Sequence, residues 1–353
     1  MTGTVVVAVV ALAVGIAIGM VVSNEPRQPA PLDDSRDAAD PPVAPSSPDA
    51  DAAPEPVPVP EPVPEPEPEP EPGVGVLGEF DVSMVGVRDW YEQSTGPRGL
   101  DESSLRVHEG RMDVREDGAV VEGRLVEGSL HVHARDVVIR GSVINGSVHF
   151  REGAHNGRLV DSVVRSGGPY PVRANYGATE VVLEHCEIDG RRSTNNNGGV
   201  AGGNITVRYC ELHSHTDSAK VTSNSVWEYN WLHTNGTWGT DAHPDGLQST
   251  GGTNIVVRRN FIDMPNAPTG NNSAMHFQAT FRPLRDILIE ENYLNGGNYT
   301  VYVRADDRGH GDPENVRILD NRMGRDFRYG LFSTQGDVTR QGNVWHDTGS
   351  PID

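Results

Sequence analysis

Cysteine is scarce in this sequence: the 353 residues include only Cys186 and Cys210. Two cysteines are too few for a disulfide framework, and their spacing matches no zinc-site pattern. The apolar period of 3.6 residues and the Ala/Leu-rich runs of a helical repeat protein are also lacking. Positive charge is not in excess either. Residues 1–78, with 13 acidic and 2 basic residues, account for −11 of the net charge of −21, and the rest of the chain is mildly acidic. We therefore expect no nucleic-acid partner.

Charge is absent altogether from residues 4–22. As a helix this segment would span roughly 28 Å, close to the hydrocarbon thickness of a bilayer. It lacks the leading cation and the clear small-residue cleavage site of a signal peptide. We predict that residues 1–22 form a single-pass membrane anchor with the remainder of the chain outside the cytoplasm. The alternative is a cleaved signal peptide and a secreted protein.

Residues 23–72 hold 17 of the 26 prolines and end in alternating Pro and Glu. Proline fixes φ and removes donors, and repeated glutamates repel one another, so an extended, disordered linker is predicted. Residues 73–119 are expected to form an N-terminal cap and the first turns, and residues 120–353 the main domain, which we expect to be a monomer.

A short pattern recurs from about residue 120, with aliphatic residues at positions 1, 3 and 8 and a small polar residue at position 6. Clear copies are VVIRGSVI (137–144), VVLEHCEI (181–188), ITVRYCEL (205–212), IVVRRNFI (255–262), ILIEENYL (287–294) and VRILDNRM (316–323), with weaker copies at 157–164, 225–232 and 338–345. Nine copies spaced by 20 to 32 residues indicate a solenoid. Period-2 alternation and β-branched residues indicate strands. The predicted fold is all-β, a right-handed parallel β-helix of about nine to ten coils.

The small polar position of the repeat predicts a column of stacked side chains. Its members are Ser142, Ser162, Cys186, Cys210, Asn230, Asn260, Asn292, Asn321 and Asn343. The five asparagines indicate an asparagine ladder, in which side-chain amides bond one another at a tight turn and tolerate left-handed backbone. The two cysteines are expected to be inert buried thiols rather than a disulfide.

Two phrases, HTDSAKVT (215–222) and HPDGLQST (243–250), repeat within the segments that precede the ladder strands. Aligning these segments places apolar residues inward and a second column outward. The outward column is predicted to be Arg173, Val200, Lys220, Gln248, His276, Tyr302 and Phe332, with Gln278 and Arg304 two residues further on. Cations, amides and aromatic side chains on one face are typical of a site that binds an anionic sugar chain, and Trp238 is a further candidate for substrate binding.

Asp217 and Asp245 of the two phrases are expected to stack in adjacent coils, where two carboxylates repel unless one is protonated or a cation lies between them. Three arrangements remain open. The pair could bind Ca²⁺ together with Asp241 and Asn197, act as an acid/base pair for glycoside hydrolysis, or bond backbone amides at turns. With His215 and His243 they could also form a zinc cluster.

The strings HPDGLQ, GGTNIVVRRNFI, LNGGNYTVYVR, RMGRDFRYG and GNVWHDTG make the sequence similar to bacterial secreted or surface β-helix proteins of the pectate-lyase-like superfamily, over about residues 95–353. That resemblance implies action on polysaccharides, commonly acidic ones, by lyase, hydrolase or epimerase chemistry. The hydrolase motifs of the superfamily match poorly, because Gly309-His310-Gly311 lacks a preceding Asp-Asp.

The lyases of the superfamily use a Lys or Arg base near Asp-bound Ca²⁺, and Lys220 beside Asp217 and Asp245 suits that chemistry. We therefore predict a polysaccharide lyase with Lys220 as base and His276 or Tyr302 as acid. Arg304 and Arg173 would hold the substrate carboxylate, in one groove shared by Lys220, His276 and Arg304. A glycoside hydrolase and a non-catalytic glycan-binding rod remain as alternatives.

Overall fold

The computed structural model describes residues 81–352, apart from 193, 195–197, 240–241 and 267–269. The predicted anchor and linker lie outside the described residues, as do Asn197 and Asp241. Within the described residues, no helix is both long enough and apolar enough to cross a membrane.

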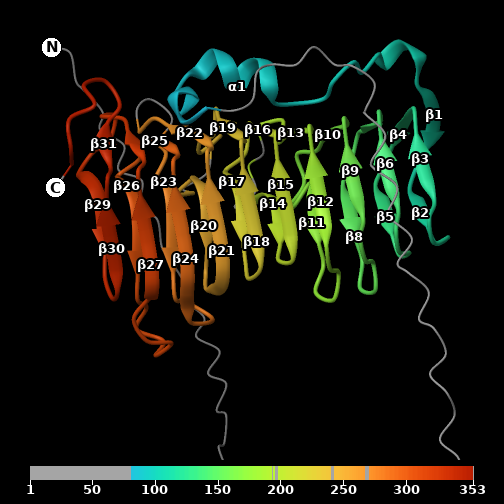
Figure 1. Ribbon diagram of the computed structural model, residues 1–353. Helices are drawn as coiled ribbons and strands as arrows, with labels where there is room; N and C mark the ends of the chain where they lie inside the picture. Colours follow the sequence, from blue (N-terminus) through green and yellow to red (C-terminus); the bar gives the residue numbers. More distant parts are fainter. Residues whose placement is uncertain (1–80, 193, 195–197, 240–241, 267–269, 353) are drawn as a thin grey trace, which may run out of the picture. The chain divides into compact units, whose positions relative to one another are not determined.

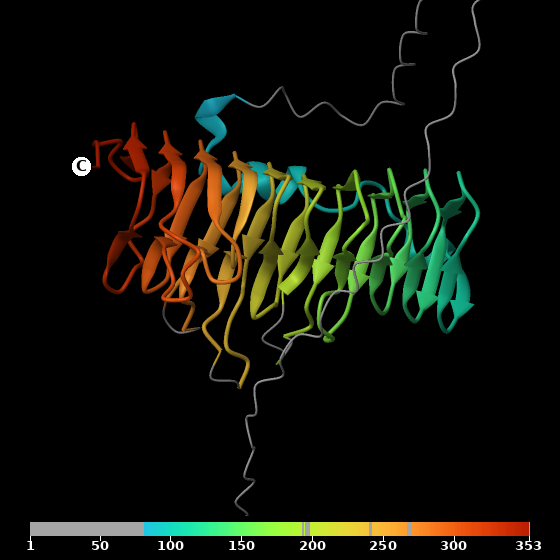
Figure 2. The same cartoon turned by 90° about the horizontal axis from the view of Figure 1, so that it is seen from below.

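The chain coils through three parallel sheets, which confirms the predicted all-β parallel β-helix (Figure 1). Figure 2 shows the same stack of coils after a turn of 90°. Sheet A contains β1 (Arg106–Glu109), β4 (Arg124–Glu127), β7 (Val143–Ile144), β10 (Val163–Arg165), β13 (Glu187–Asp189), β16 (Glu211–His213), β19 (Trp231–His233), β22 (Phe261–Met264), β25 (Tyr293–Gly296), β28 (Arg322–Met323) and β31 (Val344–Trp345). The right-handed sense of the coil stays a prediction.

Two further sheets have ten strands each. Sheet B contains β2 (Met112–Val114), β5 (Leu130–Val132), β8 (Val148–Phe150), β11 (Val172–Ala174), β14 (Gly198–Gly202), β17 (Asp217–Val221), β20 (Asp245–Ser249), β23 (Ser273–Gln278), β26 (Tyr299–Arg304) and β29 (Gly330–Thr334). Sheet C contains β3 (Val120–Glu122), β6 (Val138–Arg140), β9 (Arg158–Val160), β12 (Val181–Glu184), β15 (Ile205–Arg208), β18 (Ser225–Glu228), β21 (Gly252–Arg258), β24 (Leu284–Glu290), β27 (Glu314–Leu319) and β30 (Val338–Gln341). The strands thus begin at Arg106, before the first copy of the sequence repeat.

The eight-residue repeat spans a strand of sheet C, a sharp turn and the next strand of sheet A. Its aliphatic positions are inside: Ile255, Val257 and Ile262 are each 0% exposed, for example. They belong to one continuous hydrophobic core that fills the coils from Val114 to Leu331. Burying such a column of Val, Ile and Leu is the main stabilising contribution, at about 25 cal/mol per Å² of apolar surface.

The asparagine ladder is confirmed at the turn between sheets C and A. The Nδ2 of Asn230 donates to the Oδ1 of Asn260 at 2.9 Å, and the same bond links Asn260 to Asn292 at 3.0 Å. Asn321 and Asn343 continue it, and the serines and cysteines occupy the earlier coils. The left-handed backbone lies at the residue before each ladder position, as at Tyr229 and Arg259, rather than at the asparagine itself. Cys186 and Cys210 are buried free thiols, as expected.

The N-terminal segment forms η1 (Val82–Met84), α1 (Arg88–Ser94) and η2 (Glu102–Ser104). Tyr91 of α1 is fully buried against Trp231 and Phe261 on the outer face of sheet A, and its hydroxyl donates to the carbonyl of Arg259 at 2.9 Å. In Figure 1 this segment runs along the sheet A edge of the stack. The helix therefore covers sheet A and leaves the outer face of sheet B to the candidate site.

The register of sheet B corrects the predicted outward column at both ends. Arg173 pairs with Ala201, and Ala201 pairs with Lys220, so Ala201 takes the place predicted for Val200. Val200 is fully buried instead. At the other end Ser333 stands beside Tyr302, in the place predicted for Phe332.

The reason for the shift in β14 is a histidine ring. A side chain at Gly199 would lie only 2.5 Å from the ring of His215, so this coil is glycine-rich where its neighbours carry side chains. The space at Gly199 admits the His215 ring, and Val200 supplies the inward apolar side chain in its place.

Candidate functional site

The centre of sheet B carries the two aspartates of the repeated phrases, each at the first position of its strand. Asp217 begins β17 and Asp245 begins β20, and their side chains are 5% and 0% exposed. Ala219 and Leu247, two positions on, pair with each other in the core. The aspartates therefore sit in adjacent coils, as predicted.

Lys220 and Gln248 join the two carboxylates into one network. The Nζ of Lys220 donates to the Oδ2 of Asp217 and to the Oε1 of Gln248. The Nε2 of Gln248 donates to the Oδ2 of Asp245 at 3.0 Å. The backbone N–H of Asp245 closes the ring by donating to the Oδ1 of Asp217 at 2.8 Å. The difference between Lys in one phrase and Gln in the other thus gives one cation to the pair.

Asp245 has more donors around it. Its Oδ1 accepts from the Nδ2 of Asn272 at 2.9 Å and from the hydroxyl of Ser273 at 2.5 Å, while Nδ1 of His276 lies 3.3 Å from its Oδ2. Every carboxylate oxygen of Asp217 and Asp245 therefore has a protein donor. A Ca²⁺ ion here would have to displace Lys220 and several of these bonds, so the residues as they lie do not fit a calcium site.

The charges in this network shift the pKa values of Asp217 and His276. Burial, and then the charge of Asp245, raise the pKa of Asp217 to about 6, against the lowering effect of Lys220. Burial lowers the pKa of His276, but its hydrogen bond to Asp245 and the charge of that carboxylate outweigh burial, so the net shift is upward. His276 is therefore favoured as a proton donor next to a buried carboxylate.

Further along the column, His276 pairs in register with Tyr302, and their rings lie 4.8 Å apart. Tyr302 is only 8% exposed, and burial is the largest cause of its raised pKa. Gln278 donates to Asp306 at 3.0 Å and stands beside Arg304, whose guanidinium lies 5.9 Å from the Tyr302 ring.

Two hollows flank these residues, and they divide the predicted site. A groove of about 640 Å³ is bordered by Lys220 and Arg173, whereas Arg304 and Gln278 line a separate hollow of about 250 Å³. His276 lines neither of the two. Lys220, His276 and Arg304 are therefore not brought together in either hollow, because the larger one follows the turns between sheets B and C, from Tyr170 to Arg282.

The larger groove has a distinctive lining. It contains three cations, Arg173, Lys220 and Arg282, and three aromatic residues, Tyr170, Tyr176 and Phe281. Among the described residues that line it, none is acidic, although the chain has 50 acidic residues and 29 basic ones. Tyr176 and Phe281 are 90% and 64% exposed, and the guanidinium of Arg308 lies 4.8 Å from the centre of the Phe281 ring.

Arg282, Tyr170, Tyr176 and Phe281 were not among the residues predicted from the sequence. They lie outside the strands, and of the four only Tyr170 falls within a segment covered by the repeat alignment.

Lys220 also stands out by its residue type. It is the only lysine in the chain, and every other basic residue among the 29 is arginine. A guanidinium stays protonated, whereas an amine can lose its proton, so Lys220 is the one side-chain amine available for proton transfer. The amino-acid composition alone shows that the chain has a single lysine, so Lys220 could have been singled out from the sequence on this ground.

Other predicted residues lie elsewhere. The indole N–H of Trp238 donates to the carbonyl of His215 at 3.0 Å, and Trp238 lines neither hollow. His215 is buried, its Nε2 donates to the carbonyl of Ile188 at 2.9 Å, and burial lowers its pKa to about 4. His243 is exposed. In the described part of the chain the predicted zinc cluster of these histidines with the aspartates does not form.

Comparisons with known proteins add little. No protein-family model matches the sequence, and no curated protein matches it. Among solved structures, the chain is similar to a hyperthermoactive exopolygalacturonase from Thermotoga maritima, with 11% sequence identity and a TM-score of 0.32. The likeness covers 73% of this chain and 96% of that one. With a TM-score this low, it supports no statement about activity.

Proposed function

We propose that the protein binds an acidic polysaccharide in the groove beside Lys220 and cleaves it by β-elimination. The observation that carries the proposal is the groove itself, with three cations, exposed rings and no acidic residue among the described residues that line it. Cations and aromatic faces match a polymer that offers carboxylates and the apolar faces of sugar rings. The rest of the domain is acidic and would repel such a polymer, which directs it to this groove.

In this proposal Arg173 and Arg282 bind the uronate carboxylate. Their charges stabilise the negative charge that develops when the adjacent carbon loses its proton. The base must lie near that proton, and Lys220 is the amine at the groove edge.

Lys220 donates to Asp217 at rest, so it must first give up a proton. Asp217 can receive it, because its raised pKa of about 6 makes the protonated form accessible. Transfer within the pair leaves a neutral amine and a neutral carboxyl in a buried position. The amine then takes the substrate proton, and the carbon–oxygen bond to the leaving sugar breaks as the double bond forms.

His276 is the better proposed acid for the leaving oxygen. It lies two strands from Lys220, about 10 Å along the sheet, whereas Tyr302 lies a strand further away. Neither residue lines the groove, so this role requires the sugar chain to extend from the groove over Gln248. The upward shift of the His276 pKa favours the protonated form that a general acid needs. Hydrolysis by Asp217 and Asp245 is disfavoured, because both carboxylates are buried and bonded to protein donors.

The predicted N-terminal anchor and linker extend the proposal: the domain would act outside the cytoplasm, held to a membrane or secreted. Calcium dependence stays a prediction that the bonded aspartates do not favour.

A panel of uronate polysaccharides tests the proposal with the full-length protein, in the presence of Ca²⁺ and of chelator. New ultraviolet absorbance from an unsaturated uronate supports the lyase, and Lys220→Arg, which keeps the charge, should lower that turnover at least about a hundredfold. Reducing ends without absorbance would point to a hydrolase, and retention without product to a binder. Undiminished turnover in the Lys220→Arg variant would rule out Lys220 as the base.

Binding is tested separately from chemistry. Arg173→Gln and Arg282→Gln should each weaken retention on the polysaccharide about tenfold, because each removes a charged hydrogen-bond donor. Arg317→Gln is a matched control, since Arg317 is an exposed arginine on sheet C outside the groove. Equal losses in all three variants would show that net charge, and not the groove, binds the polymer.

A further inference from the structure

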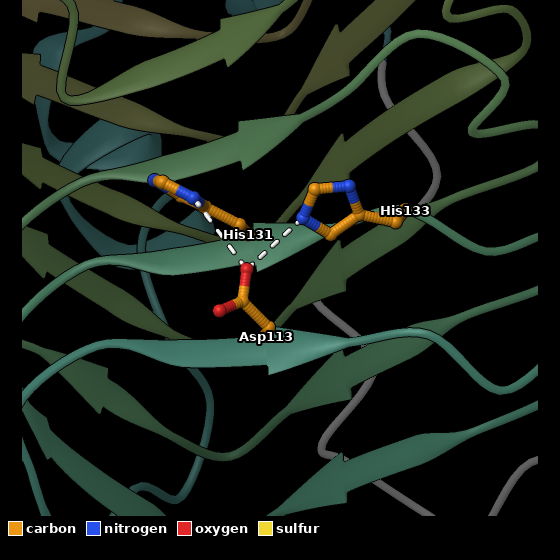
Figure 3. A group of neighbouring side chains, drawn as sticks. All are labelled: Asp113, His131 and His133. Carbon is orange, nitrogen blue, oxygen red and sulfur yellow. Dashed lines mark hydrogen bonds and ion pairs between the residues drawn. The ribbon is translucent and has the colours of Figure 1, made fainter.

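Three potential metal-binding side chains meet at the N-terminal end of sheet B, several coils before the groove (Figure 3). Asp113 of β2 pairs in register with His131 of β5, and His133 follows two residues later on the same face of the chain. Leu130, Val132 and Ala134 alternate with them and are buried, so the histidine side chains project outward.

The geometry is that of ligands around one ion. The Nε2 of His133 lies 3.0 Å from the Oδ1 of Asp113, and the Nδ1 of His131 lies 3.8 Å from the same oxygen. All three ligand atoms lie within 4.8 Å of one another. Bonds of about 2.0–2.1 Å in a tetrahedral site place ligand atoms about 3.3 Å apart, so only small rotations are needed. A distance of 3.8 Å is too long for a hydrogen bond, so His131 approaches Asp113 without bonding to it.

We propose that Asp113, His131 and His133 form a binding site for a divalent transition-metal ion, with Zn²⁺ as its representative. Two imidazole nitrogens select such ions over Ca²⁺ and Mg²⁺, which prefer all-oxygen ligands. Three protein ligands leave a further coordination position for water or an anionic ligand. The site is separate from the groove and does not depend on the proposed function.

The neighbouring histidine supports the site. His149, one coil further, stacks in parallel on His131 with ring centroids 5.3 Å apart, which fixes the orientation of that ring. The buried Nε2 of His149 has no hydrogen-bond partner among the described residues.

Two arginines contact Asp113 and compete weakly with an ion. Arg111 binds the Oδ2 at 3.0 Å, which leaves the Oδ1 available, and Arg115 approaches the Oδ1 only to 3.7 Å. Their side chains are 62% and 66% exposed, and ion pairs at that exposure contribute little. The ligand side chains are 14% to 26% exposed, so an ion can reach them.

The test uses the full-length protein, freed of metal with chelator and then titrated with Zn²⁺ in equilibrium dialysis. Visible absorption of added Co²⁺ gives a second readout of the ligand set. His131→Gln and His133→Gln should each weaken Zn²⁺ binding at least about tenfold and change the Co²⁺ spectrum. His243→Gln, at an exposed histidine outside the cluster, is the matched control and should bind as the unchanged protein does.

Circular dichroism of the metal-free variants checks that the coils remain folded. If a histidine variant does not fold, Asp113→Asn gives the same test, because it keeps the side-chain shape and removes the anionic ligand. Zn²⁺ affinity that is unchanged in these variants, or that is lost in His243→Gln, would overturn the site. Absence of binding by the unchanged protein would overturn it as well.

Discussion

Replacing Lys220 with methionine is expected to destabilise the protein at pH 8 and to have almost no electrostatic effect at pH 5. The reason is the titration of Asp217, whose pKa in the fold is about 6, above the 3.8 of an unperturbed aspartate. A raised carboxyl pKa means that the folded state binds the proton more tightly than the unfolded chain does. Its contribution to stability is therefore present below pH 3.8 and is lost as the pH rises from 3.8 to 6.

The size of the effect follows from the cost of keeping this carboxyl in the fold. At pH 8 the raised pKa costs the unchanged protein about 3 kcal/mol, from 2.2 pH units at 1.36 kcal/mol each. Without Lys220 the pKa of Asp217 rises further, but the cost cannot exceed that of binding a proton, about 6 kcal/mol at pH 8. The variant should thus lose up to about 3 kcal/mol more at pH 8. At pH 5 the carboxyl is already protonated in both folded proteins, and the difference is close to zero.

The measurement is urea unfolding at both pH values, for the unchanged protein and for Lys220→Met. A stack of coils can open locally, so the hydrogen exchange of the backbone amides of β17 and β20 is measured as well. Faster exchange there shows that the stability is lost in these two strands. Asp217→Asn combined with Lys220→Met lacks the carboxyl of Asp217, so its stability relative to Asp217→Asn should be equal at the two pH values. A cost of Lys220→Met that is the same at pH 5 and pH 8 would refute the reasoning.

Three further predictions concern the ladder, the acid and the amine. Asn260→Leu should lower the free energy of unfolding by about 2–4 kcal/mol in denaturant unfolding, because buried polar groups of Asn230 and Trp227 lose their partner; a milder loss would mean that neighbouring coils relax around the site. If His276 is the acid, turnover should fall as the pH rises through its raised pKa, and His276→Gln should remove that limb of the pH–rate profile; a limb that persists would assign it to another group. Reductive methylation followed by peptide mass spectrometry should modify Lys220 as the only side chain, and bound polysaccharide should slow it; equal rates with and without polymer would place the polymer away from Lys220.

Much of the fold could be predicted because it repeats. A strand pattern with one small polar position fixed the turn between sheets C and A, and the bonds from Asn230 through Asn343 bear it out. The prediction was wrong where one coil differs from its neighbours. In β14 the buried ring of His215 occupies the space of a side chain at Gly199, and Val200 moves inward. A long-range contact of this kind leaves no trace in a local pattern.

The site was only partly predictable for a related reason. Residues within strands, such as Asp217, Lys220 and Gln248, follow from the register and were found together. Tyr176, Phe281 and Arg282 lie in turns of different length, and their meeting in one groove depends on the path of each turn. The cluster at Asp113 was missed because the sequence before residue 137 has no small polar residue at position 6 of the repeat. The first coils were therefore not aligned with the others.

The paired aspartates are not needed to hold two coils together. Elsewhere in the same molecule adjacent coils are joined by neutral amides, as between Asn260 and Asn292, without any buried charge. At Asp217 the fold instead carries a buried carboxyl whose ionised form costs about 3 kcal/mol near neutral pH, and it offsets part of the repulsion with the only lysine of the chain. Arginine would supply the same charge with more hydrogen bonds, but it could not release a proton to Asp217. In the proposed function, lysine is needed at this position because proton transfer at the groove edge requires a side chain that can lose its proton.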